Sequence, residues 1–224
     1  MIMIPRTYLI ALFLNFTSMM AQTPIRYVAL GDSYTICTGA QKNESWPLLL
    51  SLHLGENKIP TQLIANPSHN GWTTQDLIEK ELPILDRSNA TFVTLLIGVN
   101  DWVRGIDEAT FSNNLITIID HIQKELPDKK MLLLITIPDF GVTPVGAGYA
   151  NGRNISKGIE AFNTIIKAEA KKRGLSFVDL FELSKEMGKD ATLVATDGLH
   201  PSAKEYAIWE KQIYPIAFKM LERK

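Results

Sequence analysis

Short apolar runs that alternate with longer helical patterns are the feature that most constrains the fold of this chain. Five runs rich in β-branched and aliphatic residues have the length of strands: 25–30, 61–65, 92–97, 131–137 and 175–180. Between them, apolar residues recur at helical spacing, as at Phe111, Leu115 and Ile118. Strands that alternate with helices are typical of an α/β protein with a mostly parallel sheet.

Cap residues and prolines predict where the helices begin and end. Ser45 and Pro47 mark the start of one helix, in which Leu48, Leu49 and Leu52 are expected to face the core. The other predicted helices are 75–82, which ends before Pro83, a long helix around 111–126, 155–173, which Gly174 closes, and a last one that Ser202 caps. No linker or repeat follows residue 22, so we expect one domain over 22–224 with a doubly wound sheet.

Composition and charge exclude several classes of protein. The 224 residues carry a formal net charge of -1, and the four histidines are scattered, so no basic face predicts binding to nucleic acid or to an anionic membrane. The single cysteine, Cys37, forms no intramolecular disulfide, and no Cys/His cluster has the spacing of a zinc site. We expect Cys37 to be a small buried apolar residue.

The first residues have the order of a secretory signal peptide. Arg6 precedes an apolar run over 8–14, and small residues follow at Ser18 and Ala21. The run is short for a bilayer span, although an uncleaved membrane anchor is the alternative. We therefore expect a signal peptide over 1–21 and an exported protein, periplasmic or secreted, with no stable membrane span after cleavage.

The stretch Gly31-Asp32-Ser33-Tyr34 directly follows the first predicted strand. A strand that ends in glycine and then offers a serine before a helical pattern suits presentation of a nucleophile at the edge of a sheet. The same residue types are common in turns, where Gly supplies unusual dihedral angles and Asp and Ser bond to nearby backbone. Alone, the stretch leaves both interpretations open.

Asp197 and His200 lie three residues apart in a predicted loop. At that spacing the carboxylate can reach one imidazole nitrogen, fix the tautomer and stabilise the imidazolium that forms when the other nitrogen takes a proton. A serine needs such a base, because its hydroxyl is a poor nucleophile when unassisted. Local capping in a solvated turn is the alternative for this pair.

Two further positions offer hydrogen-bond donors for an oxyanion. Gly71 can present an unobstructed backbone N–H, and Asn100 can present a side-chain amide, as acyl transfer requires where negative charge develops. The alternatives are a turn at Asn70-Gly71 and a helix cap at Asn100. Asp32 and Asp101 are expected to brace these loops by accepting backbone N–H groups.

Four of these segments follow predicted strands in chain order: 31–33, 66–71, 98–101 and 197–201. Three stretches, Gly31-Asp32-Ser33-Tyr34, Gly98-Val99-Asn100-Asp101 and Asp197-Gly198-Leu199-His200-Pro201, resemble blocks of the SGNH (GDSL-type) hydrolase family. The resemblance covers essentially everything after the predicted signal peptide. It implies a three-layer α/β/α sandwich with a five-stranded parallel sheet, flavodoxin-like.

The resemblance also implies a role for each site residue. Ser33 would be the nucleophile, His200 the general base and then acid, and Asp197 the orienting carboxylate. The backbone N–H of Ser33, Gly71 and the side chain of Asn100 would form the oxyanion hole. The reaction would pass through an acyl-serine intermediate and would need neither a metal nor an organic cofactor.

The substrate is less constrained than the chemistry. Four aromatic residues fall on loops at the predicted active edge, where they would line an acyl or aryl pocket or pack the loops: Trp72, Trp102, Phe140 and Tyr149. Trp72 also stands where many family members have a small or acidic residue. Arg104 is expected to form an ion pair rather than to bind substrate. The irregular loop 138–154 has the length of a functional or mobile loop.

We therefore predict an exported serine esterase that acts on small-molecule carboxylic esters or thioesters, in the range of lysophospholipases and acyl-thioesterases. The substrate would be an acyl lipid, an aryl ester or an acetylated sugar. A carbohydrate O-acetylesterase is the alternative with the same chemistry, and a non-catalytic binding protein on the same fold is the alternative of another class. The chain lacks the Gly-x-Ser-x-Gly elbow of α/β-hydrolases and the glycine pattern of dinucleotide-binding folds.

Overall fold

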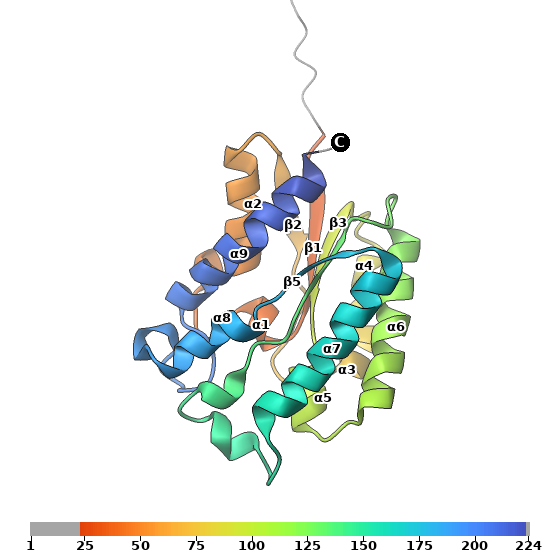
Figure 1. Cartoon of the computed structure of the whole chain (residues 1–224). Coiled ribbons are helices and arrows are strands. Elements are labelled where there is room, and N and C mark those ends of the chain that lie inside the picture. The colour runs from red at the N-terminus through yellow and green to blue at the C-terminus, as the bar shows by residue number, and fades with distance from the viewer. Residues whose placement is uncertain (1–22, 223–224) are drawn as a thin grey trace, which may run out of the picture.

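In the computed structural model, which describes residues 23–222, a parallel sheet lies between two layers of helices (Figure 1). The predicted signal peptide over 1–21 lies outside the described residues. Neighbouring strands pair in parallel in the order β2-β1-β3-β4-β5. The strands are β1 (Ile25–Gly31), β2 (Thr61–Ala65), β3 (Phe92–Leu96), β4 (Leu132–Ile135) and β5 (Ser176–Val178). The prediction of a five-stranded parallel sheet is confirmed.

The central strands are buried along almost their whole length. All residues of β3 and β4 are buried, in agreement with their continuous apolar sequences, because helices cover both faces of a parallel sheet. Tyr27 of β1 lies opposite Phe92 of β3, and the Tyr27 hydroxyl is 2.8 Å from Oγ1 of Thr94. The edge strand β2 has no fully buried residue, so the core is densest around β1, β3 and β4.

Helices cover both faces of the sheet (Figure 1). One layer contains α1 (Ser33–Ile36), α2 (Trp46–Glu56), α8 (Phe181–Ser184) and α9 (Ala203–Leu221). The other contains α3 (Thr74–Lys80), α4 (Leu82–Leu85), α5 (Val99–Val103), α6 (Glu108–Glu125) and α7 (Ile155–Arg173). Short 3₁₀ helices lie in the connections: η1 (Lys42–Glu44), η2 (Phe140–Val142), η3 (Gly146–Tyr149), η4 (Lys185–Gly188) and η5 (Ala191–Leu193). The architecture is the three-layer α/β/α sandwich that the resemblance implied.

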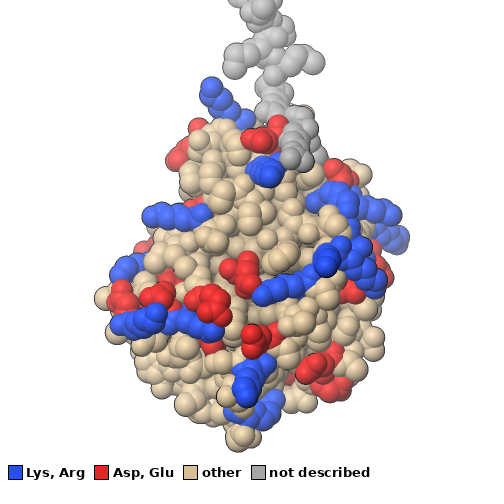
Figure 2. Space-filling model, in the orientation of Figure 1, with Lys and Arg blue, Asp and Glu red and all other residues tan. Residues whose placement is uncertain are grey.

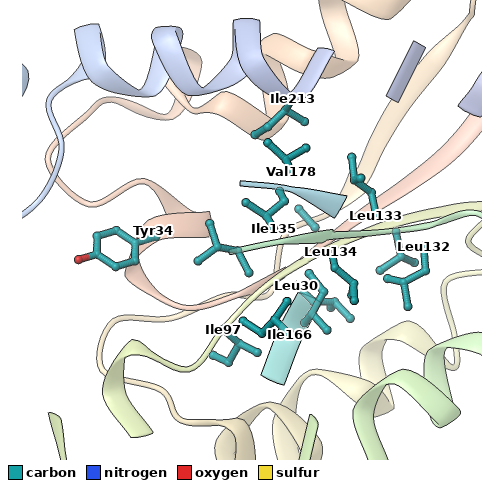
Figure 3. Packing of buried hydrophobic residues seen from close by; sticks show 14 of the residues in the cluster. Leu30, Tyr34, Ile97, Leu132, Leu133, Leu134, Ile135, Ile166, Val178 and Ile213 are labelled. Carbon is teal, nitrogen blue, oxygen red and sulfur yellow. The ribbon is translucent and has the colours of Figure 1, made fainter. Parts of the chain in front are cut away.

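The core extends to both sides of the sheet. Figure 3 shows Ile213 of α9 on one side of the strands and Ile166 of α7 on the other. Cys37 is buried in the same cluster, as the sequence predicted for a small apolar residue. Burial of both sheet faces explains why the strand sequences are runs of apolar residues rather than alternating patterns.

The predicted buried side of α2 is wrong. Leu52 is exposed and Leu48 and Leu49 are half-buried, whereas the buried positions are Trp46, Pro47, Leu50, Ser51 and Leu54. Leucines occur on almost every side of this helix, so their spacing alone selects no face. The packing of α2 against α9 and β2 decides which of them enter the core.

Two helix boundaries also differ from the prediction. Ser45 occupies the N-cap position of α2, but its hydroxyl donates to the carbonyl oxygen of Lys42 at 2.8 Å instead of capping the helix. Pro83 does not end the helical segment after α3, because α4 begins at Leu82 and holds Pro83 within its first two positions. A proline there loses no hydrogen bond, since the first N–H groups of a helix have no partner inside it.

The apolar runs extend beyond the paired strands. The run 131–137 was expected to be a strand, but β4 ends at Ile135. Ile137 is still buried, and the side chain of Asn163 on α7 accepts its N–H at 2.7 Å and donates to its C=O at 2.8 Å. A side-chain amide thus replaces the strand partner where the chain leaves the sheet.

The strand order reverses at β1. After β1 the chain enters β2 on one side, and after β2 it crosses to β3 on the other side. The last residues of the two neighbouring strands, Gly31 and Leu96, lie opposite each other in the parallel register. In a doubly wound sheet, ligands bind outside the carboxyl ends of the strands at such a switch point.

Two surface properties bear on the expected partners. Over residues 23–222, none of the helices has both the length and the apolar character needed to cross a bilayer. On the face shown in Figure 2, basic and acidic side chains are interspersed and neither sign forms an extended patch.

Candidate active site

Ser33 lies at the carboxyl end of the central strand β1 and is the first residue of α1. Asp32 is the N-cap of this helix, and its Oδ1 accepts the N–H of Tyr34 at 3.0 Å. Space requires glycine at position 31, since a Cβ there would lie 2.1 Å from the carbonyl oxygen of Leu96. The stretch is therefore a strand-to-helix turn pressed against the end of β3, with Ser33 at its tip.

Asp197 and His200 form a hydrogen-bonded pair in the loop 194–201. Nδ1 of His200 lies 2.6 Å from Oδ2 of Asp197, and Oδ1 accepts the backbone N–H groups of Leu199 and His200, each at 2.9 Å. Partial burial by itself would raise the pKa of Asp197, but the hydrogen bonds outweigh it and lower the pKa below its ordinary value. An ionised Asp197 places the proton of a neutral imidazole on Nδ1, which leaves the lone pair on Nε2.

The loop of His200 packs closely against the segment that follows α1. The N–H of Ala195 donates to the carbonyl oxygen of His200 at 2.8 Å, which closes the loop. A Cβ at Gly39 would lie 2.6 Å from Cβ of Ala195, so only glycine permits this approach. The rings of Tyr34 and His200 meet edge to face, with centroids 6.1 Å apart. These contacts bring the imidazole to the segment that carries Ser33.

Gly71 lies on the loop after β2, and Asn100 lies in the first turn of α5, after β3. Nδ2 of Asn100 donates to the carbonyl oxygen of Trp72 at 2.9 Å, which uses one of its two N–H groups. Nη2 of Arg104 donates to the carbonyl oxygen of Gly71 at 2.6 Å. The ion pair expected for Arg104 is present, since its Nη1 lies 3.9 Å from Oδ2 of Asp76, although the carbonyl oxygen of Gly71 is the closer partner of its guanidinium. Asn100 and Arg104, at the start and just beyond the end of α5, thus both hold the loop of Gly71 through its backbone carbonyl oxygens.

Asp101 braces the segment of Asn100 from behind. Its carboxyl group accepts the backbone N–H of Thr74 at 2.9 Å and also the hydroxyl of Thr74. Burial raises the pKa of Asp101 in spite of these hydrogen bonds. The contact ties α5, which carries Asn100, to the first turn of α3, which follows the loop of Gly71.

A cavity of about 250 Å³ opens where these segments meet. Its polar lining includes the four residues Ser33, Gly71, Asn100 and His200, and its apolar lining includes Val99, Val103, Phe140, Tyr149 and Leu199. Asp197 lies behind His200. Of the four aromatic residues considered for substrate contact, Phe140 and Tyr149 belong to this lining, and Trp72 and Trp102 lie outside it.

Trp102 is buried on the side of α5 that faces α7. The guanidinium of Arg153 lies 3.9 Å from the centre of the Trp102 ring, and its Nη1 donates to the Trp102 carbonyl oxygen at 2.6 Å. A Cβ at Gly158 would lie 1.7 Å from Nε1 of Trp102, so the indole packs directly on the backbone of α7. Trp72 stacks on His69 with ring centroids 5.1 Å apart. Both tryptophans thus make packing contacts outside the cavity lining.

The loop 138–154 forms one wall of the cavity. It is not a disordered connection, because it contains η2 and η3 and bonds to the loop of His200 through the N–H of Val145 and the carbonyl oxygen of Gly198, at 3.0 Å. The rings of Phe140 and Tyr149 meet edge to face with centroids 6.3 Å apart and both line the cavity. The loop therefore supplies apolar surface beside the polar residues.

Two charged residues near the site have no signal in the sequence. Glu81 is fully buried, and its Oε2 accepts the N–H of Gly31 at 3.0 Å. In the sequence it ends the charged stretch Glu79-Lys80-Glu81, which has the composition of a solvent-facing helix side. Arg153, which packs on the Trp102 ring and donates to its carbonyl oxygen, lies in a glycine-containing loop whose sequence matches no known motif. Neither position is distinguished by its neighbours in the chain.

Comparison with known proteins agrees with this geometry. The sequence profile of the GDSL-like Lipase/Acylhydrolase family matches residues 29–208. The esterase TesA of Pseudomonas aeruginosa is 23% identical over 175 residues, which are 78% of this chain and 79% of that protein. An arylesterase of Vibrio mimicus is 28% identical over 121 residues, which are 54% of this chain and 60% of that protein.

The fold is shared with solved structures. The crystal structure of TesA matches with a TM-score of 0.71 at 23% identity, over 87% of this chain and 99% of that one. The family profile begins within β1 and ends within α9, so it includes all the loops that meet at the cavity. On this basis the chain belongs to the GDSL-like Lipase/Acylhydrolase family, the SGNH hydrolases, and is an ester-hydrolysing enzyme.

Proposed function

We propose that the protein cleaves carboxylic esters through an acyl intermediate on Ser33. The observation that carries this proposal is the cavity that Ser33, Asn100 and His200 line together, with the imidazole bound to Asp197 on its far side. A nucleophile, a base with its orienting carboxylate and a candidate oxyanion donor at one concave site are the elements of acyl transfer.

The proposed reaction has two steps. Oγ of Ser33 attacks the ester carbonyl carbon while Nε2 of His200 takes the hydroxyl proton, and the imidazolium is stabilised by Asp197. The same proton then passes to the leaving alcohol, and the acyl group remains on Ser33. In the second step a water molecule attacks the acyl carbon, His200 takes its proton, and the Ser33 hydroxyl leaves as the carboxylic acid is released.

The oxyanion formed in each step needs hydrogen-bond donors. We assign this role to the backbone N–H groups of Ser33 and Gly71 and to the side chain of Asn100. The amide of Asn100 has one N–H left after its bond to Trp72, and that bond holds the amide plane in place. The hydrogen bond from Arg104 to the carbonyl oxygen of Gly71 likewise holds in place the loop that carries the Gly71 N–H.

The walls of the cavity limit the substrate class. A volume of about 250 Å³ lies just below the range of drug-sized ligand pockets, about 300–1,000 Å³, and the apolar wall is built from Val103, Phe140 and Tyr149. These properties support an ester or thioester with a short to medium acyl chain or an aryl group. Acetylated sugars remain the alternative substrates of the same chemistry.

The experiment is an assay of the purified protein on aryl esters of increasing acyl length, alongside acetylated sugars, with Ser33→Ala as the control. The proposal expects activity that rises from acetate to a medium chain and is lost in Ser33→Ala. A preference for acetate whatever the alcohol would favour the carbohydrate deacetylase instead. Parent-level activity in Ser33→Ala would remove Ser33 from the mechanism.

We also propose export of the mature domain over 22–224. The support is the order of Arg6, the apolar run and the small residues up to Ala21 in the sequence. Cell fractionation with mass spectrometry of the N-terminus tests this. The proposal expects an exported protein that begins at Gln22, and an intact N-terminus in the cytosolic fraction would contradict it.

A further inference from the structure

Tyr34 follows the proposed nucleophile directly and has no part in the proposed two-step reaction. The family is named after the letters G-D-S-L, whereas this chain has Gly31-Asp32-Ser33-Tyr34, so a tyrosine stands in place of the leucine. Tyr34 is almost fully buried, yet it belongs to the lining of the cavity. An aromatic ring therefore lies at the site, at a position where the family name has an aliphatic residue.

Hydrogen bonds hold the backbone of Tyr34 on both sides. Its N–H donates to Oδ1 of Asp32 at 3.0 Å, and its carbonyl oxygen accepts the Nε1–H of Trp46 at 2.9 Å. Figure 3 shows its ring directed away from the other labelled residues of the core. Within residues 23–222 the hydroxyl of Tyr34 forms no hydrogen bond, so the ring is held by packing.

The ring of Tyr34 contacts both the imidazole of His200 and the indole of Trp209. It meets each of them edge to face, with centroids 6.1 Å from His200 and 5.8 Å from Trp209. Both distances fall in the range of about 4.5–7 Å that aromatic pairs prefer. Trp209 is fully buried in α9, where its Nε1 donates to Oε1 of Glu205 at 2.7 Å and the ring of Tyr206 packs on it at 5.3 Å. Tyr34 thus links the imidazole to a rigid part of the core.

The other partner of the imidazole lies on the solvent side. Nδ1 of His200 is bonded to the carboxylate of Asp197, which is exposed, whereas Tyr34 is buried. One hydrogen bond at Nδ1 fixes the tautomer, but it leaves the ring free to tilt about that bond. A second contact is needed to fix the direction of the lone pair on Nε2. Within the part of the chain that the structure describes, Tyr34 is the aromatic residue whose ring packs on His200.

We propose that Tyr34 is a positioning residue whose ring, backed by Trp209, holds the imidazole of His200 in the orientation in which Nε2 meets Oγ of Ser33. The inference rests on the roles proposed for Ser33 and His200. Because Tyr34 follows Ser33 in the same turn, the segment that carries the nucleophile also carries the support of its base. The spacing of two groups that lie far apart in the chain then depends on one residue.

The expected consequence is a loss of base catalysis when the ring is removed. A general base acts only within hydrogen-bond reach of the proton that it takes. Displacement of a reacting group by about 1 Å can cost on the order of a hundredfold in rate. An aliphatic side chain at position 34 fills part of the same space, but it has no ring to pack on the imidazole of His200.

The test compares three substitutions of Tyr34 with one matched control. Tyr34→Phe keeps the ring and removes the unpaired hydroxyl. Tyr34→Leu introduces the residue of the family name, and Tyr34→Met fills an irregular apolar space without a ring. The control is Tyr214→Leu, because Tyr214 also packs on a histidine, His53, with ring centroids 3.6 Å apart, and lies on α9 outside the cavity lining.

Two measurements are made on each variant. Steady-state kinetics on an aryl ester separates kcat from KM. A long-range proton–nitrogen correlation spectrum of the histidine rings reports the tautomer of each imidazole and, through the line widths, its mobility. The chain has four histidines, so the spectrum is simple, and the signals that vanish in His200→Ala are those of His200.

We expect Tyr34→Phe to keep kcat within about threefold of the parent and to keep sharp His200 signals. Tyr34→Leu and Tyr34→Met are expected to lose about tenfold or more in kcat with a smaller change in KM, and their His200 signals should broaden or report a mixture of tautomers. Tyr214→Leu should follow the parent in both measurements.

Four results would overturn the proposal. They are parent kcat in Tyr34→Leu and Tyr34→Met, sharp parent-like His200 signals in these variants, and a loss in Tyr34→Phe equal to theirs, which would point to the hydroxyl. The fourth is failure of both Tyr34→Leu and Tyr34→Met to fold, which would assign the ring to the core alone. A loss confined to KM would count against the proposal in the same way, because it would make Tyr34 a substrate contact.

The spectrum keeps this inference separate from the proposed function. If Ser33→Ala retained activity, the mechanism through Ser33 would fall, but the His200 signals of Tyr34→Leu would still report whether the ring holds the imidazole. If those signals matched the parent's while Ser33→Ala was inactive, the positioning role of Tyr34 would fall and the role of Ser33 would stand.

Discussion

Nδ1 of His200 lies 2.6 Å from Oδ2 of Asp197, and the other oxygen of the same carboxylate accepts two backbone N–H groups of the same loop. The carboxylate thus orients the imidazole and also shapes the loop that carries it. The two tasks use different oxygen atoms, so substitution can separate them.

Asp197→Asn is the variant that separates them. Its amide oxygen can still accept the N–H groups of Leu199 and His200. Its Nδ2, however, is a donor that would face the protonated Nδ1 of His200, so two donors would oppose each other. The tautomer with the lone pair on Nε2 is then disfavoured, and we expect kcat/KM on an aryl ester to fall on the order of a hundredfold or more.

Thermal unfolding serves as the control for this variant. The midpoint should stay close to that of the parent, because the loop keeps its backbone hydrogen bonds. A variant with parent activity would show that Asp197 does not orient His200 during turnover, and a variant that unfolds would assign the carboxylate to the loop alone.

Asn100→Ala removes the side-chain donor assigned to the oxyanion hole. The expected loss is roughly a hundredfold or more in kcat, with a smaller change in KM, because the donor acts mainly where negative charge develops. Steady-state kinetics on an aryl ester separates the two constants. A loss confined to KM would place Asn100 in ground-state binding, and an unchanged kcat would remove it from the mechanism.

Arg104→Ala tests whether the Gly71 carbonyl must be held. The guanidinium donates to this carbonyl at 2.6 Å, and its loss frees the loop that presents the Gly71 N–H. We expect kcat to fall by about tenfold, because small displacements of a donor weaken its action in the transition state. Arg87→Ala, which removes an exposed arginine outside the cavity lining, is the matched control. Equal effects of the two substitutions would exclude a positional role for Arg104.

Gly158→Ala tests the packing of α7 on α5. A Cβ at position 158 would lie 1.7 Å from Nε1 of Trp102, so the indole or the helix must shift. We expect the free energy of unfolding to fall by about 1–3 kcal/mol, the usual cost of overpacking. Gly55→Ala in α2 is the matched control, because no atom lies within 4 Å of its Cβ and alanine favours a helix by about 1 kcal/mol. Equal stabilities of the two variants would contradict the close packing of Trp102.

The sheet and its order of loops were predictable because their signals are local. Each strand is an apolar run of suitable length, and the segments with Ser33 and Asn100 directly follow the ends of β1 and β3, whose direction a parallel sheet fixes. The loop of His200 comes after β5, with α8, η4 and η5 in between. The sequence therefore predicts that these residues, far apart in the chain, lie at the same edge of the sheet, even though no contact between them can be read from the sequence.

Properties that depend on packing between layers were not predictable. The buried face of α2 is selected by α9, a helix at the other end of the chain. Trp102 lies on a helix at the active edge, but its side chain packs against Arg153 and Gly158 instead of lining the cavity. Glu81 looks like a solvent-facing residue in the sequence, but the turn between α3 and α4 directs it to Gly31. In each case the deciding partner lies far along the chain.

The central claim is that Ser33 carries the acyl group. Brief reaction of the purified enzyme with an aryl ester, followed by acid quenching and peptide mass spectrometry, measures this directly. We expect the acyl mass on the peptide that contains Ser33 and no acylated peptide in Ser33→Ala. An acyl group found on another residue of an active enzyme, or unchanged acylation in Ser33→Ala, would contradict the proposed mechanism.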